Sequence, residues 1–439
     1  MVDEETVVLS AEKNDRLTRV GPGTPMGEFA RRFWTPFLLS SELAEPDGPP
    51  RRVRLLGEDL IAFRQTDGQV GLVGAWCPHR GAPMFFGRNE HCGLRCIYHG
   101  WKFDHSGACV DMPNTTQGET FQSKVRIEAY PVEERGGVLF AYLGPDEQRP
   151  PLPHLPWSEN FEKLGAPYAA GCLRHEGPGN WLQHIENLVD ESHVGFLHAG
   201  LDDVSSVAGS MQGAVYSDRA PEVDPVLETG YGLIAGFYRN AGEERINVRA
   251  NAYQLPFTVD VMVPPPVMLG TWQVPVPIDD ENTMFFGIVY SVDGPIPREK
   301  AKLMAAEGQV RFIEGTAHLA ANRDNDYGLS RELQRTTTFS GISGTRAQDS
   351  AVAEMQFGGF ITDRSRERLV PSDRAIVMLR NMLLHELDKF EEAGTTNAPW
   401  MLASTELRGV DFNIESKADL TSACVQRMER AVGDTVLPA

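Results

Sequence analysis

The chain of 439 residues is 41% hydrophobic, which is enough to bury the cores of two or three domains. Its 61 acidic and 41 basic residues give a formal net charge of −20, which argues against nucleic acid or an anionic membrane surface as a partner. Six cysteines are too few for a disulfide scaffold. No apolar run reaches the ~18–20 residues of a membrane span, and the acidic N-terminus lacks a signal peptide pattern, so we expect a cytoplasmic protein.

The first third of the chain is predicted to form a helical arm and a small β domain. Two helices are expected in residues 1–45, the second over 27–37, where Pro36 ends it. This segment is expected to pack as an arm on a larger domain. Residues 46–155 have the short alternating runs of β-strands, with Asp67-Gly68 as a hairpin turn.

Residues 156–439 are predicted to form the larger domain, with an antiparallel sheet surrounded by helices. Strands are expected over 232–240, within 245–263 and over 283–292, and helices over 180–198 and 297–315. A long helix capped by Ser372 is expected to bury a stripe of apolar residues, namely Ile376, Leu379, Leu383, Leu387 and Phe390. The predicted fold class is therefore α+β, with an all-β domain preceding the larger mixed domain.

Two loops of the β domain each carry one thiol and one imidazole. They are Cys77-Pro-His79-Arg-Gly81 and Cys96-Ile-Tyr-His99-Gly100. A [2Fe–2S] cluster with two cysteine and two histidine ligands needs this set, and the adjacent glycines let the backbone approach the bridging sulfides. A Cys2His2 zinc site uses the same ligand types, but zinc modules usually pair like ligands and place the histidines on a helix. The pattern therefore favours the iron–sulfur cluster over zinc.

The segment 180–198 brings two further imidazoles and a carboxylate together. If it is helical, Asn187, Asp190 and His193 share one face, and Gly195 would loosen the helix so that His198 can swing back. Two neutral imidazoles and one carboxylate leave coordination positions open on a non-heme Fe(II). The alternative is an ordinary hydrogen-bonded or solvated helix face, which is the more common role of histidines in this setting.

The two motifs together resemble the Rieske non-heme iron aromatic-ring-hydroxylating oxygenases, and the small β domain resembles their Rieske [2Fe–2S] domain. The segments 19–27, 180–183 and 348–352 are similar to the α subunits of the phthalate dioxygenase branch. The resemblance implies a ligand for each metal: Cys77 and Cys96 for the buried iron of the cluster, His79 and His99 for the exposed iron, and His193, His198 and Asp349 for the catalytic Fe(II). Asp363 is the fallback carboxylate, although pairing with Arg364 or Arg366 is a simpler role for it.

The resemblance also implies how electrons reach the iron. Asp190 would bridge a histidine of the catalytic iron to a cluster histidine of a neighbouring subunit, in a homotrimer or a hexamer of two stacked trimers. A simpler role for Asp190 is to orient His193. Asn187 would lie close to the iron without binding it. Because the chain has no nicotinamide-binding motif and no plant-type ferredoxin motif, a separate NAD(P)H reductase must supply the electrons.

The expected reaction is dihydroxylation of a carboxylated aromatic, such as phthalate or a substituted benzoate, with O2. Arg239 is the first candidate to anchor the substrate carboxylate, followed by Arg245 and Arg249, and residues 200–215 are a candidate lid. A monooxygenase or O-demethylase acting on a carboxylated aryl ether would use the same irons. More remote alternatives are an electron carrier and a zinc-stabilised binding protein.

Overall fold

The computed structural model describes residues 9–115, 121–155, 157–158, 172–200, 221–240, 245–263, 269–291, 296 and 310–431. The chain divides into two compact units: a smaller one of Gly21–Gly23 and Gly27–Leu152, and a larger one of Met1–Val20, Thr24–Met26 and Pro153–Ala439. Among the described helices, none has the length and apolar character needed to cross a membrane.

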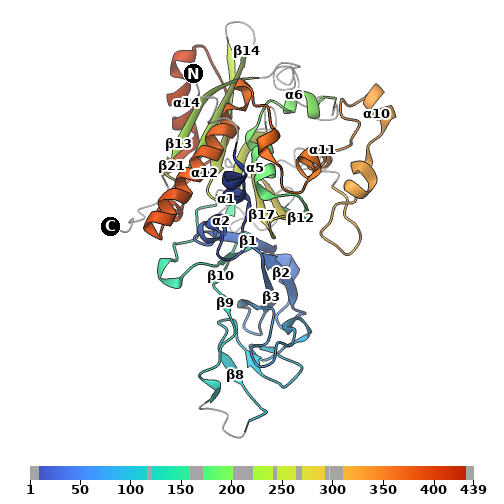
Figure 1. Cartoon of the computed structure of the whole chain (residues 1–439), viewed down its shortest axis with the longest axis vertical. Helices are drawn as coiled ribbons and strands as arrows, with labels where there is room; N and C mark the ends of the chain where they lie inside the picture. Colours follow the sequence, from blue (N-terminus) through green and yellow to red (C-terminus); the bar gives the residue numbers. More distant parts are fainter. Residues whose placement is uncertain are drawn as a thin grey trace. The chain divides into compact units, whose positions relative to one another are not determined.

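The smaller unit consists of three antiparallel sheets (Figure 1). The first contains β2 (Arg51–Leu55), β3 (Glu58–Arg64), β4 (Val70–Gly74) and β9 (Ala129–Tyr130) in that order. The second has the order β1 (Trp34–Leu39), β11 (Val138–Tyr142) and β10 (Val132–Arg135). The third contains four short strands, β5 (Arg88–Asn89), β6 (Leu94–Arg95), β7 (Lys102–Phe103) and β8 (Cys109–Asp111).

The predicted hairpin at Asp67-Gly68 is confirmed, because it joins β3 to β4 and Gly68 takes a positive φ of 88°. The helix predicted over 27–37 is wrong beyond residue 30. The helix α2 covers only Pro25–Ala30, and residues 34–39 are the edge strand β1, paired with the fully buried β11. An edge strand tolerates Pro36, and the ladder shifts register beside it. The segment expected to be one arm is thus divided between the two units.

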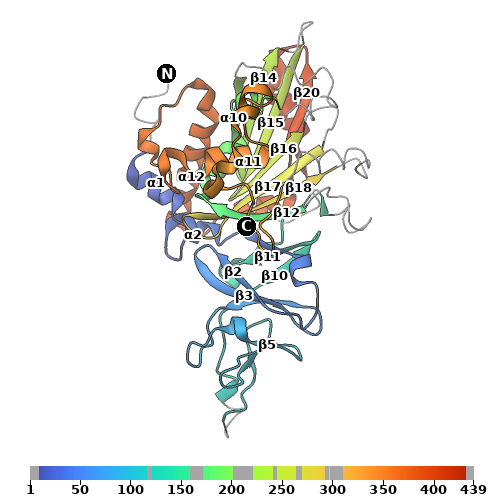
Figure 2. The ribbon, with the colours of Figure 1, turned by 90° about the vertical axis from the view of Figure 1, so that its right-hand side faces the viewer.

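The larger unit is built on an antiparallel sheet whose strand order in the described residues is β12-β18-β17-β16-β15-β14-β13 (Figure 2). The strand β20 pairs with the first half of β15, while β16 pairs with its last three residues. The bounds are β12 (Cys172–Pro178), β13 (Glu222–Thr229), β14 (Gly232–Asn240), β15 (Ile246–Gln254), β16 (Thr258–Val263), β17 (Leu269–Pro277), β18 (Asn282–Tyr290) and β20 (Val410–Ile414). The strands expected from the sequence correspond to β14, β15 with β16, and β18, so the α+β prediction is confirmed.

Helices pack against this sheet and against one another. The helix α5 (Trp181–Val189) lies on β15, β16 and β17 and contacts α1 (Ala11–Thr18), α11 (Thr345–Ala353) and α12 (Arg374–Ala393). The described residues also form α6 (Val194–Leu197), α10 (Arg331–Thr336), α13 (Ala398–Ser404) and α14 (Leu420–Met428), and a small sheet pairs β19 (Thr405–Leu407) with β21 (Glu429–Ala431). In α12 the predicted stripe is buried at Leu379, Leu383, Leu387 and Phe390, although the helix begins at Arg374 rather than directly after Ser372. Most of the helix predicted over 297–315 lies outside the described residues.

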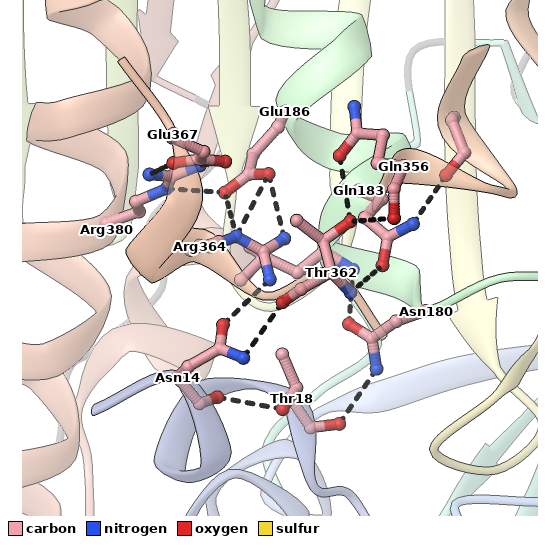
Figure 3. A network of polar contacts seen from close by, with 12 residues as sticks. Asn14, Thr18, Asn180, Gln183, Glu186, Gln356, Thr362, Arg364, Glu367 and Arg380 are labelled. Atoms are coloured by element: carbon pink, nitrogen blue, oxygen red, sulfur yellow. Dashed lines mark hydrogen bonds and ion pairs between the residues drawn. The ribbon is translucent and has the colours of Figure 1, made fainter. Parts of the chain in front are cut away.

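A buried ionic network holds α5 in place (Figure 3). Glu186 accepts hydrogen bonds from Arg364 at 2.8 Å and from Arg380 at 2.6 Å, and all three side chains are almost fully buried. Arg364 also donates to Asn14 of α1, and Arg380 pairs with Glu367. Burial alone would raise the pKa of Glu186, but the two guanidinium groups outweigh it and lower the pKa to about 2.

Glu186→Gln should therefore lower the free energy of unfolding by about 3–5 kcal/mol, because it leaves two buried guanidinium groups without their common counter-ion. The matched control is Glu391→Gln, which removes an exposed partner of Arg16 and should change stability by about 0.5 kcal/mol or less. Denaturant unfolding at several pH values measures both. Since the folded pKa of Glu186 is lowered from 4.5 to about 2, the advantage of the wild type should shrink as the pH falls through this window. An equal effect of both variants would contradict this account.

Candidate active site

The segment 180–198 is two helices separated by a turn. Asn180 caps α5, as its side chain accepts the N–H of Leu182, and the helix ends at Val189 with Asp190 already in an extended conformation. The carboxylate of Asp190 accepts the N–H groups of Ser192 at 2.7 Å and His193 at 3.1 Å. The prediction of one helical face carrying Asn187, Asp190 and His193 is therefore wrong, because Asp190 makes a local side-chain cap that stops the helix.

The turn nevertheless brings Asp190 and His193 together. Oδ2 of Asp190 lies 3.1 Å from Nδ1 of His193, and α6 then carries the chain to His198. Asn187 lies in the last turn of α5 and is partly buried, so its predicted position beside the iron stays a prediction. Of the candidate lid over 200–215, residues 201–215 lie outside the described residues.

Three of the predicted ligands converge on one point. The ligand atoms of His193, His198 and Asp349 all lie within 4.8 Å of one another, and they form the one such group of histidine, cysteine and acidic residues in the described part of the chain. Oδ1 of Asp349 is 3.3 Å from Nε2 of His198 and 3.8 Å from Nε2 of His193. This oxygen is buried and accepts no hydrogen bond, which fits a group that binds a metal ion.

Hydrogen bonds on the far side of each ring aim both Nε2 atoms at this point. Nδ1 of His198 lies 2.7 Å from Oε1 of Gln348, whose amide nitrogen donates to Ser340 and to the carbonyl oxygen of Ile342. Because that amide nitrogen is occupied as a donor, Oε1 must accept, and the proton of His198 is on Nδ1. Nε2 of His198 is then free to bind a metal, as Nε2 of His193 is when Asp190 holds its Nδ1 proton.

The charges of the site suit a divalent cation. Burial would lower the pKa of His193, but the hydrogen bond to Asp190 and the charge of Asp349 raise it. Burial would raise the pKa of Asp349, but the neighbouring His198 and Arg346 lower it, so the carboxylate is ionised. The fallback ligand Asp363 is exposed and caps its own turn by accepting the N–H and hydroxyl of Ser365. Asp349, on α11, is therefore the carboxylate that the geometry favours.

The two cysteine–histidine loops of the smaller unit have the same backbone pattern. The N–H of each cysteine donates to the carbonyl oxygen five residues later, and Gly81 and Gly100 donate back to the carbonyl oxygens of Cys77 and Cys96. Both glycines have positive φ, 68° and 80°, and a Cβ on Gly100 would lie 2.7 Å from the ring of Pro113. The glycines are thus required by the turn itself.

The ligands of these loops are arranged as a two-iron cluster requires. Cys77 and Cys96 are buried, and burial raises the pKa of Cys77 to about 11, so this thiol ionises only when a metal binds it. His79 and His99 are partly exposed, with ring centroids 4.5 Å apart, and Nδ1 of His79 is buried without a hydrogen-bond partner. The four ligand atoms do not meet at one point as a zinc site requires, and this fits inner cysteine and outer histidine ligands.

The arginine candidates differ in their surroundings. Arg245 is exposed, whereas Arg239 of β14 and Arg249 of β15 are buried beside Glu191. Nη2 of Arg239 donates to the carbonyl oxygen of Glu191, while its Nε and Nη1 have no hydrogen-bond partner in this structure. Two of the three candidates are therefore buried, although arginine side chains usually lie at the surface. Glu191 could not be recognised from the sequence, because its partners lie on strands distant along the chain.

Comparison with known proteins agrees with this arrangement. Residues 33–131 match the Rieske [2Fe-2S] domain, and residues 141–411 match the family described as LigXa C-terminal domain like. The chain is 36% identical over 401 residues to the 3-chlorobenzoate-3,4-dioxygenase oxygenase subunit of Comamonas testosteroni, covering 87% of this chain and 89% of that protein. It is 34% identical over 395 residues to the phthalate 4,5-dioxygenase oxygenase subunit of Pseudomonas putida, covering 88% and 87%.

A third relative has a different activity. The chain is 34% identical over 399 residues to the 5,5'-dehydrodivanillate O-demethylase oxygenase subunit of a Sphingobium strain, covering 87% of this chain and 81% of that one. Solved structures share the fold: caffeine-bound NdmA of Pseudomonas putida CBB5 has a TM-score of 0.57 at 20% identity over 89% of this chain and 98% of that one. Dicamba monooxygenase bound to dicamba has a TM-score of 0.53 at 18% identity, covering 83% and 99%.

Two centres, a cysteine–histidine iron–sulfur cluster and a three-ligand mononuclear iron, define an iron-dependent oxygenase that receives its electrons one at a time. The motifs alone left a choice between an iron–sulfur cluster and a zinc site. The match to the Rieske domain and the long alignments to the dioxygenase oxygenase subunits decide for the iron–sulfur cluster. The chain belongs to the Rieske non-heme iron oxygenases, as an oxygenase α subunit.

Proposed function

We propose that this protein dihydroxylates a carboxylated aromatic of the benzoate or phthalate type. The observation that carries this proposal is the group of three candidate ligands among the described residues, a number that leaves coordination positions of an iron open. The relatives of the chain include oxygenase subunits of 3-chlorobenzoate and phthalate dioxygenases. The overall change is arene plus O2, two electrons and two protons to a cis-dihydrodiol. An iron held by His193, His198 and Asp349 would supply open coordination positions and the redox chemistry that activates O2.

The residues of the chain have separate tasks in this scheme. Cys77, Cys96, His79 and His99 hold the cluster, which takes electrons from a separate NAD(P)H reductase. His193, His198 and Asp349 hold the catalytic iron, and the hydrogen bonds to their outer atoms fix their orientation. Asp190 is proposed to link His193 to a cluster histidine of a neighbouring subunit. A cytoplasmic location is part of the same proposal.

The proposal includes a neighbouring subunit because exposed apolar side chains lie beside both centres. Trp76, Ile97 and Tyr98, beside the cluster ligands, are 57%, 61% and 55% exposed. Phe196, which lies between His193 and His198 in the sequence, is exposed and makes an edge-to-face contact with the exposed Phe339, with ring centroids 5.6 Å apart. Exposed apolar patches of this kind mark protein–protein contacts. We infer that the cluster face of one subunit docks on the iron face of the next in a head-to-tail ring.

Mixing two inactive variants tests electron transfer between subunits. His99→Ala lacks an intact cluster and Asp349→Ala lacks the catalytic iron, so neither chain can turn over by itself. In rings assembled randomly from equal amounts, half of the clusters and half of the iron sites are intact, and about one quarter of the wild-type activity should return. Metal counts of each variant are the control. No recovered activity in verified mixed rings would show that electrons do not cross between subunits.

Arg239 remains the candidate anchor for the substrate carboxylate, since two of its buried N–H groups have no hydrogen-bond partner in this structure. Arg239→Met should raise KM for an aromatic carboxylate at least about 30-fold, the low end of the ~2–5 kcal/mol cost of breaking a buried charge pair. KM for an uncharged aromatic analogue should hardly change. The control Arg245→Met alters an exposed arginine of the same region and should leave both KM values unchanged. An equal rise for both substrates would rule out an anchoring role.

The reaction type is tested by product analysis under labelled O2. The purified protein with a suitable reductase and NAD(P)H is incubated with 3-chlorobenzoate, phthalate and a methoxylated benzoate. The proposal predicts a cis-dihydrodiol that carries both labelled oxygen atoms. The second candidate function, favoured by the similarity to the O-demethylase, predicts turnover of the methoxylated acid to a phenol that keeps its own unlabelled oxygen. One labelled atom leaves with the methyl carbon as formaldehyde, and the other is reduced to water.

A further inference from the structure

A buried cluster of charged side chains lies directly after Asp190 in the fold. Glu191 is only 2% exposed, and its Oε2 lies 3.3 Å from Nη1 of Arg249 and 3.9 Å from Nη1 of Arg239. Nε of Arg249 is 3.6 Å from a carboxylate oxygen of the buried Asp411 on β20. Two arginines and two carboxylates make the cluster formally neutral. Such a cluster is expensive to bury, so its position calls for a functional reason.

The same side chains hold the backbone on both sides of Asp190. Nδ2 of the Asn251 side chain donates to the carbonyl oxygen of Leu188 and to Oε1 of Glu191, each at 3.3 Å. Nη2 of Arg239 donates to the carbonyl oxygen of Glu191, also at 3.3 Å. Asn251 and Arg239 project from the neighbouring strands β15 and β14 of the sheet. The residues before and after the Val189-Asp190 pair are thus tied to the rigid sheet.

This attachment bears on the iron because of what holds Asp190. Among the described residues, the hydrogen bonds of its carboxylate stay within the turn that it caps, to the N–H groups of Ser192 and His193 and the ring of His193. A shift of the turn therefore moves the carboxylate and the iron ligand His193 together. Clamping Glu191 from the sheet is the means by which the structure fixes both.

We propose that Glu191 is a positioning residue, which holds the Asp190–His193 turn on the sheet and thereby keeps the path between the two iron centres short. The inference rests on the bridging role proposed above for Asp190. In the step concerned, one electron leaves the reduced cluster, which becomes oxidised, and one electron arrives at the catalytic iron site. Glu191 itself touches neither metal nor substrate.

The test compares Glu191→Gln with Asp411→Asn in the holoenzyme. Both variants remove one buried carboxylate beside Arg249, but only Glu191 is attached to the turn. The first readout is amide hydrogen exchange of the peptide spanning 187–198. Exchange should be about tenfold faster in Glu191→Gln, which corresponds to a loss of about 1.4 kcal/mol of local stability, and unchanged in Asp411→Asn.

The second readout is the single-turnover rate at which the reduced cluster is oxidised after O2 is added with substrate. Glu191→Gln should slow it at least about tenfold with both metals retained, since a misplacement of about 1 Å can slow a step that depends on precise orientation by about 100-fold. Asp411→Asn should slow it less than about twofold. Equal effects of the two variants on exchange and rate would reduce Glu191 to a purely structural role, and no effect of Glu191→Gln would overturn the proposal.

The result for Asp190→Asn separates the two hypotheses. If Asp190→Asn slows cluster oxidation while Glu191→Gln does not, the positioning role of Glu191 is wrong and the bridging role of Asp190 is retained. If Asp190→Asn turns over normally, the bridging role on which the inference rests fails. In that case faster exchange in Glu191→Gln shows only that the turn is clamped, and the proposed effect on electron transfer is lost.

Discussion

Asp349→Ala should lose its mononuclear iron and its oxygenase activity and still keep a reducible iron–sulfur cluster. Among the residues that the structure describes, Asp349 is the one carboxylate that meets His193 and His198 at the candidate iron site. Loss of a hydrogen-bond partner behind a metal ligand already lowers affinity about 10–100-fold, and loss of the ligand itself should lower it further. Iron analysis together with the visible spectrum of the cluster measures both effects.

The matched control is Asp363→Ala, which removes the other acidic candidate. Because Asp363 is exposed and caps a local turn, this variant should bind as much mononuclear iron as the wild type. Its free energy of unfolding should lie within about 0.5 kcal/mol of that of the wild type. If the iron is lost in Asp363→Ala and kept in Asp349→Ala, the assignment of the third ligand is wrong.

Asp190→Asn should keep both metals and stall electron transfer between them. Asparagine preserves the size of the side chain, and its single carbonyl oxygen can still accept the N–H of Ser192 or of His193, which bind separate carboxylate oxygens of Asp190, so part of the cap of the turn is retained. The substitution removes the negative charge that faces Nδ1 of His193 at 3.1 Å and the second carboxylate oxygen proposed to reach the next subunit. Steady-state turnover should fall at least about 100-fold, a loss comparable to that of other precisely placed groups.

Stopped-flow absorbance of the cluster distinguishes this result from a binding defect. Reduction of the cluster by the reductase should be unchanged in Asp190→Asn, while its oxidation in the presence of O2 and substrate should be slow. Normal oxidation of the cluster in this variant would remove the bridging role and leave Asp190 as a residue that only orients His193.

The cluster loops and the sheet strands were predictable because their signals are local. Cys77, His79, Cys96 and His99 stand at fixed short spacings, and the turns require Gly81 and Gly100. Strands such as β14 are continuous apolar runs bounded by turn residues. Asp349, in contrast, was found only through the resemblance to a family, since nothing local marks a carboxylate whose partners lie about 150 residues earlier in the chain.

The errors have equally specific causes. The three-residue spacing of Asn187, Asp190 and His193 suits a helix that continues past Val189, but Asp190 caps the following turn by accepting the N–H of Ser192, and the helix ends there. The helix predicted over 27–37 includes residues 34–37, although the aromatic residues Trp34 and Phe37 suit a strand beside β11. The Glu186 network and the Glu191 cluster join residues far apart in sequence, so they become visible only in three dimensions.

The most direct test of the account is an iron, acid-labile sulfide and zinc count on anaerobically purified protein, combined with EPR before and after dithionite. The two centres described here predict about three irons and two sulfides per chain and a Rieske-type signal that appears on reduction. A colourless protein that contains zinc and no sulfide would contradict both metal centres and the oxygenase function built on them.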